Sequence, residues 1–479
     1  MSIDEKNLQD FLIIISEILT HMEQMKTPES AMKVAKEMGM KIFTLEIKPS
    51  KELYEREKKN NQKLWDSLYF HHKLNIRDKG HKALSNIIGR ILNNQKYSLK
   101  NRVSHSSLQT SIIDNFLLAT IIQGKEMTIS LAMKIIDKSI KNVLNNIETT
   151  NYFFPCMIAY QDNEDEFIIG PIKFMTMNRF WSQNQKTIDK SLKISQEEIL
   201  KYFNKFPWIA EVIIDHLEDE RAEELSKQAV QYALNIFKIY TPHYYNKKLR
   251  IAGDTDYEPT CTLKIRNGEP LTTISSSTLG WFLHDKKFSE EAGPRFTDIS
   301  RLTGQLITSF LSGHNIPLIY QRLLNAIWWF GDAVDEQSSS AQLIKYINVI
   351  EAIINTDDRD KSTTDQFRKR TIDILSGCLD TMFDNNSQLT KHLNNIYGVR
   401  SDLVHGKKPP TDVNIYEEIS FAHDVASHVI HNAFYWSIFL AEKNVNMSLK
   451  SISREFDNSM AEFNKRWVQK KEGPNPAPG

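Results

Sequence analysis

Apolar residues recur at helical spacing through most of the last third of the chain. The clearest segment, residues 341–354, places four of them on one helix face: Leu343, Ile347, Ile350 and Ile354. The same spacing appears in four further segments, at residues 316–330, 365–379, 389–404 and 415–434. Amphipathic helices bury their apolar faces against one another. The spacing therefore predicts a helical bundle over residues 296–445.

The N-terminal region, residues 1–150, shows helical spacing as well. Its predicted helices cover residues 8–22, 82–95, 105–122 and 128–147. A short run of β-forming residues at 41–47 interrupts them. We therefore expect a mainly helical N-terminal region.

The middle region, residues 151–295, mixes the two patterns, and we consider it a candidate sensor or regulatory part. β-forming residues at 151–160 and 166–177, separated by a polar loop, predict one hairpin. The run Cys261–Arg266, followed by Asn267-Gly268, predicts a second. Residues 208–240 predict helix. We expect small β elements rather than a large sheet.

The predicted fold class is therefore mostly α, with a C-terminal helical bundle and an α+β N-terminal and middle part. Ser340 can cap the bundle helix at 341–354, and Thr411 or Asp412 can cap the last one. Residues 446–479 predict a helical extension and then a tail rich in proline and glycine, which we expect to be disordered.

Charge and cysteine content argue against several classes of protein. The 60 basic and 60 acidic residues cancel, so a nucleic-acid site would have to be a local patch. Three cysteines without a CxxC pair disfavour a disulfide framework and a structural zinc site. No apolar run approaches the roughly 20 residues of a membrane span, and the chain begins without a signal-peptide pattern, so we expect a cytoplasmic protein with no membrane partner. Walker-type, dinucleotide-binding, HExxH and GxSxG motifs are absent from the sequence.

The best candidate for a catalytic site lies at the end of the fourth bundle helix. Arg400 and His405 stand five positions apart, and Gly406, with two prolines shortly after it, predicts that the helix unwinds at His405. An unwound end lets the His405 side chain turn back towards Arg400. Lys407 and Lys408 follow in the loop, where they add positive charge for RNA phosphates.

These two residue types suit RNA cleavage without a metal. An imidazole can take a proton from a ribose 2′-hydroxyl or give one to a leaving 5′-oxygen, because its ordinary pKa is about 6.5. A guanidinium stays charged and can hold two phosphate oxygens while negative charge develops on them.

The segment from Tyr397 to Gly406 resembles the Arg-x4–6-His signature of HEPN domains. It is most similar to the Apea-like HEPN subfamily, in which a Tyr-x-x-Arg-Ser-x-x-x-His-Gly run ends the third main helix. Upstream, the pair Trp328-Trp329 and the run Ile350-Glu351-Ala352 fit the same family. The resemblance covers residues 300–440 and leaves the rest of the chain unassigned.

The resemblance implies a metal-independent endoribonuclease with no cofactor. Arg400 and His405 would be catalytic, supported by Glu351, Ser401 and Tyr397. Ser401 departs from many active members of the family, which have Asn, Asp or His after the arginine. Two copies of the motif would meet in a homodimer or higher homo-oligomer and cleave RNA, with tRNA and mRNA as candidates. Such proteins are often toxins or abortive-infection effectors in antiviral defence, which implies a phage-derived trigger.

One alternative function stays open, and so do plainer roles for the two residues. The chain could be a non-catalytic HEPN module that dimerises and binds RNA or nucleotide as a scaffold. Arg400 could pair with Asp402 or another helix acid, while His405 caps the helix.

Other conspicuous residues suit structural roles better than chemistry. Among His423, His428 and His431 only the last two share a helix face, so a solvated or dimer-facing stripe is favoured over a metal site. The adjacent His71 and His72 cannot easily share a metal either. The run Trp328–Phe330 favours bundle core or dimer interface over a platform for stacking bases.

Overall fold

The computed structural model describes most of the 479-residue chain. The described residues are 3–24, 78–94, 99, 102–122, 125–145, 147–158, 166–189, 197, 200–240, 249–252, 260–266, 269–275, 293–312, 316–355, 364–376, 386–411, 414–445, 456 and 458–466. The β-forming run at 41–47 and the pair His71-His72 lie outside them. The chain forms two compact units: Met1–Thr150 with Ile214–Glu224, and Asn151–Ile213 with Leu225–Gly479. The four-region division expected from the sequence stays a prediction.

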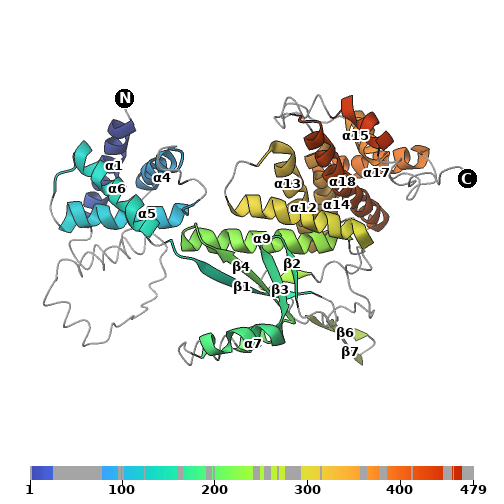
Figure 1. The fold of residues 1–479 in the computed structure, drawn as a ribbon, viewed down its shortest axis with the longest axis horizontal. Coiled ribbons are helices and arrows are strands. Elements are labelled where there is room, and N and C mark those ends of the chain that lie inside the picture. Colours follow the sequence, from blue (N-terminus) through green and yellow to red (C-terminus); the bar gives the residue numbers. More distant parts are fainter. Residues whose placement is uncertain are drawn as a thin grey trace, which may run out of the picture. The chain divides into compact units, whose positions relative to one another are not determined.

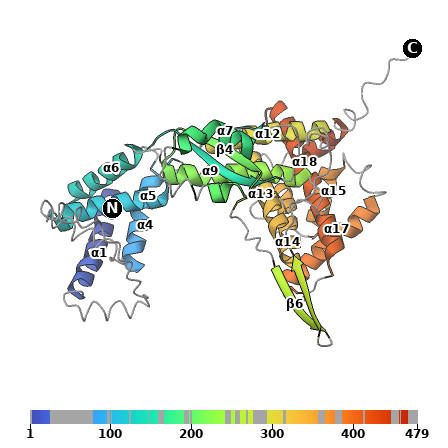
Figure 2. The ribbon, with the colours of Figure 1, turned by 90° about the horizontal axis from the view of Figure 1, so that it is seen from below.

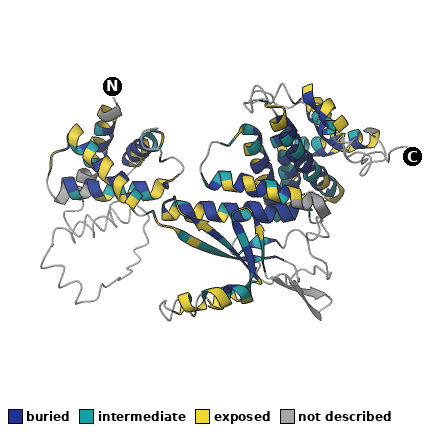
Figure 3. Cartoon of the chain, in the orientation of Figure 1, coloured by how far each residue is buried: buried dark blue, intermediate teal, exposed yellow. Residues whose placement is uncertain are grey.

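The first unit is helical, as its sequence predicts. Its helices are α1 (Ile3–Gln24), α4 (Asp78–Leu92), α5 (His105–Leu117), which continues as the π-helix η1 (Leu118–Ile122), and α6 (Ile129–Asn145). Their apolar faces form one core, in which the rings of Phe11 and Phe116 stack with centroids 5.5 Å apart. Figure 3 shows the buried residues of these helices alternating with exposed ones along each helix.

The segment from Ile214 to Glu224 is bound to the start of α5 by a buried carboxylate. Glu218, only 6% exposed, accepts hydrogen bonds from the Ser107 hydroxyl (2.6 Å) and from the amides of Ser104, Glu220 and Arg221 (3.1–3.3 Å). The Ser104 side chain caps α5 by accepting from the Ser107 amide at 2.9 Å. Burial alone would raise the pKa of Glu218, but these hydrogen bonds outweigh it and hold the pKa below its ordinary value.

We expect Glu218→Gln to destabilise the start of α5 at neutral pH, by about 1–3 kcal/mol, because the amide nitrogen would face N–H donors. A carboxylate with a lowered folded-state pKa stabilises the protein above its unfolded pKa, 4.5, and loses that effect as the pH falls below it. The difference between wild type and variant should therefore shrink below pH 4.5. Hydrogen exchange of α5 in the full chain, at neutral and acid pH, measures it. A difference independent of pH would contradict the role of the charge.

The second unit contains a five-stranded sheet with the strand order β2-β3-β4-β1-β5. Its strands are β1 (Thr150–Met157), β2 (Glu166–Ile169), β3 (Ile172–Thr176), β4 (Trp208–Ile214) and β5 (Arg250–Ile251). Figure 1 shows α9 (Asp219–Tyr240) along one face and α7 (Met177–Ile188) on the other. Phe237 of α9 contacts Phe167 and Phe174 on its face, and Phe180 of α7 packs against Met175 and Ile209 on the opposite one.

This sheet corrects two predictions. The expected hairpin between 151–160 and 166–177 is wrong, because β2 pairs with β3 across the tight turn at Gly170 (φ +58°), and β1 lies at the other side of β4. The helix expected over 208–240 begins only at Asp219, because Trp208–Ile214 pairs antiparallel with β3 instead. The sheet is therefore larger than the small β elements expected. The second hairpin is confirmed, with β6 (Thr260–Arg266) paired antiparallel with β7 (Glu269–Ser275).

The rest of the second unit is the predicted helical bundle, shown from below in Figure 2. Its helices are α12 (Gly293–Leu311), α13 (Leu318–Asp335), α14 (Ser339–Ile354), α15 (Thr364–Leu375), α17 (Asn386–Val404) and α18 (Tyr416–Glu442). The fold is thus mostly α with smaller β elements, as expected. Residues 458–466 are helical, in agreement with the predicted extension, and the tail lies outside the described residues. None of the described helices is long and apolar enough to cross a membrane.

Polar contacts bind the C-terminal half of α9 to the bundle. The Asn235 amide donates to the carbonyl of Ile327 at 3.1 Å and lies so close to Gly331 that a Cβ there would come within 2.1 Å of it. The buried ammonium of Lys238 contacts Asp335 Oδ2 at 2.6 Å, and the Tyr240 hydroxyl lies 2.9 Å from His431 Nδ1. Ion pairing and hydrogen bonding offset the desolvation of these groups.

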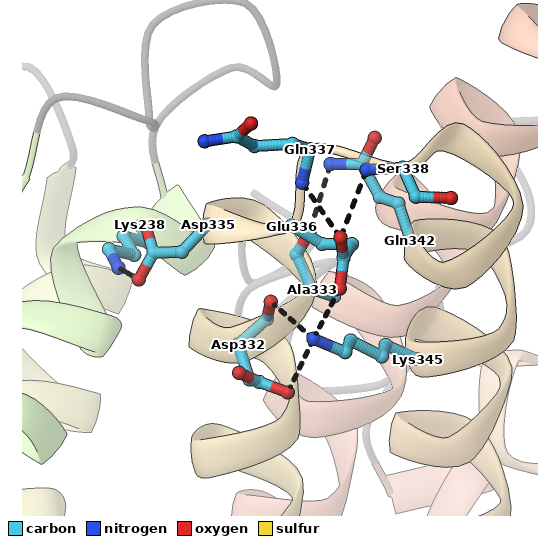
Figure 4. A network of polar contacts seen from close by, with 9 residues as sticks. All are labelled: Lys238, Asp332, Ala333, Asp335, Glu336, Gln337, Ser338, Gln342 and Lys345. Atoms are coloured by element: carbon cyan, nitrogen blue, oxygen red, sulfur yellow. Dashed lines mark hydrogen bonds and ion pairs between the residues drawn. The ribbon is translucent and has the colours of Figure 1, made fainter. Parts of the chain in front are cut away.

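The turn between α13 and α14 is held by the network in Figure 4. The Lys345 ammonium bridges Asp332 and Glu336, at 2.8 Å from each carboxylate, and Glu336 accepts from the amides of Gln337 and Ser338 at 2.9 Å. The Gln342 amide donates to the carbonyl of Ala333, also at 2.9 Å. These contacts fix the angle at which α14 leaves the turn, and α14 carries Glu351.

Two predicted helix caps are corrected. Ser338, not Ser340, caps α14 by accepting from the Ala341 amide at 3.4 Å. The N-cap position of α18 is Ile415, which offers no side-chain cap, so the predicted cap at Thr411 is wrong, and Asp412 lies outside the described residues.

Two expectations for side chains in the bundle are also corrected. The solvated histidine stripe on α18 is wrong for His423 and His431, which are buried in the bundle. Phe330 lies in the core as predicted, but Trp328 and Trp329 remain 40% and 38% exposed. Their place in a dimer interface stays a prediction.

Candidate functional site

Helix α17 ends in the left-handed turn that its sequence predicts. Gly406 has φ +71°, its amide donates to the Leu403 carbonyl at 3.3 Å, and the Lys407 amide donates to the Asp402 carbonyl at 2.8 Å. These two bonds define a Schellman motif, which satisfies carbonyls that the helix end would otherwise leave unpaired. His405 is therefore the last residue before the turn, with its amide still bonded to the Ser401 carbonyl at 3.0 Å.

Arg400 lies five residues earlier and is held from two sides. Its guanidinium contacts Glu351 of α14, with Nη2 3.8 Å from Oε2, and lies 5.7 Å from the centre of the Tyr397 ring. The side chains of Arg400 and Glu351 are 24% and 16% exposed, so this pair is screened less than a surface pair. The Arg400 Nε atom is buried and has no hydrogen-bond partner among the described residues. The arginine is thus positioned while one of its donors remains unused.

Two of the predicted supporting residues, Glu351 and Tyr397, therefore contact Arg400 with their side chains. The third, Ser401, is connected to the site through its backbone. The Tyr397 ring packs on Phe367 of α15, with centroids 4.7 Å apart, which fixes the ring beside the guanidinium. Glu351 contributes the carboxylate. Ser401 is half-buried and is connected to the site through its carbonyl, which accepts from the His405 amide.

His405 and Lys407 are exposed, whereas Arg400 is half-buried. The His405 side chain is exposed and makes no hydrogen bond or ion pair with another described residue. Lys407 is exposed and lies 3.7 Å from Asp402, whereas Lys408 is half-buried. The plainer interpretation, in which Arg400 pairs with Asp402 or another helix acid, is confirmed for a helix acid, because Arg400 pairs with Glu351 of α14, whereas Asp402 pairs with Lys407.

The loop that follows is tied to the start of α14. The Ser340 hydroxyl donates to the Pro410 carbonyl at 2.7 Å. Helix α14 therefore holds the site twice: Ser340 binds the loop after His405, and Glu351, near the other end of the helix, binds Arg400. The network at the turn between α13 and α14 positions both contacts.

The arrangement offers an acid–base group and a fixed cation on one helix end. Five residues of α-helix rotate the side-chain direction by about 500°, so Arg400 and His405 leave a regular helix about 140° apart. The His405 imidazole is exposed and makes no hydrogen bond with Arg400, so the expected return of this side chain towards Arg400 stays a prediction. No cluster of three or more metal-ligating side chains occurs in the part of the chain that the structure describes.

Sequence reasoning missed two arginines beside this site. Arg322 of α13 and Arg370 of α15 each donate a hydrogen bond to a carbonyl in the last turn of α14, close to Glu351. Residues 322, 370 and 400 lie far apart in the sequence and belong to no common motif. Only the packing of α13, α15 and α17 against α14 brings each of them to the last turn of that helix.

Searches for related proteins add no assignment. Comparisons with protein-family models, with curated proteins and with solved structures found no match for this chain.

Proposed function

We propose that this chain is a metal-independent endoribonuclease of the HEPN type, with Arg400 and His405 as its catalytic residues. One observation carries the proposal. An exposed histidine ends a bundle helix at a left-handed turn. Five residues earlier, Glu351 of a neighbouring helix holds an arginine with a buried, unused donor. This combination supplies a proton-transfer group and an oxyanion-binding group without any bound ion.

In the proposed reaction the RNA strand provides its own nucleophile. An imidazole takes the proton of a ribose 2′-hydroxyl, and the 2′-oxygen attacks the adjacent phosphorus. The Arg400 guanidinium stabilises the negative charge that develops on the phosphate oxygens. A protonated imidazole then gives a proton to the departing 5′-oxygen. The products are a 2′,3′-cyclic phosphate and a free 5′-hydroxyl.

The proposal includes a second copy of the chain. An acid and a base are both needed, and each copy supplies one His405, so two sites facing each other across a homodimer cleft would complete the reaction. Lys407 and Lys408 would attract the phosphate backbone to the cleft. The corresponding biological role is an abortive-infection effector or toxin that cleaves tRNA or mRNA after a phage-derived trigger.

The test compares the purified wild-type chain with Arg400→Ala on total RNA, with and without EDTA. We expect wild-type cleavage to persist in EDTA and to leave 2′,3′-cyclic phosphate ends, and the variant to cleave about 10²–10³ times more slowly, the usual cost of losing one oxyanion donor. The same pair expressed in bacteria exposed to phage would show RNA fragmentation with wild type alone. Loss of cleavage in EDTA would contradict the mechanism. RNA binding without cleavage under every condition would favour the non-catalytic scaffold.

A further inference from the structure

A polar cavity lies in the first unit, between α5, α6 and the start of α9. Its volume is about 380 Å³, which falls in the range of small-molecule sites, about 300–1,000 Å³. Hydroxyl groups from one face of α5 line it, and an amide of α6 lies on another wall: Ser106, Ser107, Thr110, Ser111 and Asn142. The cavity is separate from the Arg400–His405 site, which belongs to the second unit.

Buried hydrogen bonds fix the spacing of α5 and α6, which form two of the walls. The Ser111 hydroxyl donates to the Ser139 carbonyl at 3.2 Å, and the Asn115 amide donates to the Ser139 hydroxyl at 3.1 Å. Ser139 and Asn115 are both buried. The hydrogen bonds of Glu218 with the start of α5 hold the third wall in place. The cavity is therefore formed before any ligand binds, which lowers the entropic cost of binding.

The lining of the cavity is negatively charged. Asp114, Glu218 and Glu220 contribute carboxylates, and none of the described residues that line the cavity is basic. Glu218 already accepts hydrogen bonds from one hydroxyl and three amides, so it acts on a ligand through its charge alone. Glu220 accepts from the Ser104 and Ser107 hydroxyls with Oε2, and its Oε1 makes no hydrogen bond with a described residue. The N-terminus of α5 offsets only about half an elementary charge.

The charges lie at two levels along α5, with open polar groups between them. Asp114 follows Ser107, the partner of Glu218 and Glu220, by seven residues, which is two turns and about 10 Å along the same helix face. The side chain of Thr110 lies between the two levels and makes no hydrogen bond with the residues that the structure describes. A ligand that satisfies this lining is elongated, donates hydrogen bonds and carries positive charge towards both ends.

We propose that this cavity binds a linear aliphatic polyamine, with one ammonium group beside Glu218 and Glu220 and another beside Asp114. A divalent metal ion fits less well, because it gathers several oxygen ligands at one point, and the described residues contain no cluster of three or more metal-ligating side chains. A neutral sugar would leave the carboxylates without counter-charge and would find a single apolar side chain, Val143. The inference is independent of the proposed ribonuclease.

Isothermal titration of the full chain with spermidine at neutral pH tests the proposal. We expect saturable binding at one site per chain. Asp114→Asn should weaken it about tenfold, the usual effect of losing one hydrogen bond to a charged group. Thr110→Lys should abolish it, because the new ammonium occupies the cavity. Both positions are exposed, so the fold should persist. The matched control is Glu126→Gln, which removes one exposed carboxylate of the same unit outside the cavity and should leave the affinity unchanged.

Two further probes distinguish a polyamine site from a general attraction of cations. Putrescine, a shorter diamine, should bind more weakly than spermidine, because it does not reach both ends of the cavity. Magnesium chloride at equal ionic strength should not displace spermidine more than sodium chloride does. If Thr110→Lys does not fold, Thr110→Val keeps the shape, removes the hydroxyl and should weaken binding several-fold. The inference is wrong if spermidine shows no saturable binding, if Glu126→Gln loses as much affinity as Asp114→Asn, or if magnesium displaces spermidine.

Discussion

Replacing Asp335 with asparagine should lower the free energy of unfolding by about 3–5 kcal/mol, because it removes the carboxylate from a buried ammonium. The Lys238 side chain is 0% exposed, and its Nζ lies 2.6 Å from Asp335 Oδ2 (Figure 4). A buried ammonium that loses this carboxylate keeps its desolvation cost and loses the ion pair that helps to offset it. The pair joins α9 to the end of α13, so we expect the contacts between these helices to loosen first.

Chemical denaturation followed by circular dichroism measures the loss, and two further variants identify its cause. Lys238→Met combined with Asp335→Asn should recover most of the stability, because no unpaired charge remains buried. Asp298→Asn breaks the exposed pair with Arg301, 3.9 Å apart, and should cost less than about 1 kcal/mol. Equal losses in Asp335→Asn and Asp298→Asn would show that burial of Lys238 does not determine the effect.

Replacing His405 with alanine should reduce RNA cleavage by about 10²–10⁴-fold, the usual contribution of a general acid or base. Stability should change by less than about 0.5 kcal/mol, because the side chain is exposed and makes no hydrogen bond with the described residues. The Schellman turn should persist, since its bonds come from backbone groups of Leu403, Asp402 and the residues after His405. Cleavage and thermal unfolding of the same preparation measure the two quantities.

A second histidine on the same helix provides the control. His392 is exposed on α17 and its ring lies tilted against Phe421, with centroids 5.0 Å apart, so His392→Ala removes an imidazole that is outside the site. It should cleave RNA at the wild-type rate. Free imidazole should partly restore cleavage by His405→Ala and have no effect on Arg400→Ala. If His392→Ala loses as much activity as His405→Ala, a specific role for His405 is wrong.

The bundle was predictable because each of its helices has its own apolar spacing in the sequence. The apolar residues of α14 recur every three to four positions, and the structure buries Leu343, Ile347, Ile350 and Ile354 together. The sheet was not predictable from the sequence, for a physical reason. Trp208–Ile214 is apolar except for Glu211, a pattern that is compatible with a helix and with a buried strand. Only its pairing with β3 selects the strand. Likewise the tight turn at Gly170 joins β2 to β3, where the sequence suggested one continuous strand.

The candidate site divides in the same way. The sequence alone determined where α17 ends and that Arg400 and His405 lie near that end. A glycine in the left-handed conformation terminates a helix, because its amide and the next one bond to carbonyls in the last turn of that helix. Only the tertiary structure decided what surrounds them. The contact of Arg400 with Glu351, the approach of Arg322 and Arg370 to α14, and the burial of Lys238 against Asp335 each join residues on different helices. Such contacts depend on how helices pack, and neither spacing nor composition along the chain encodes that packing locally.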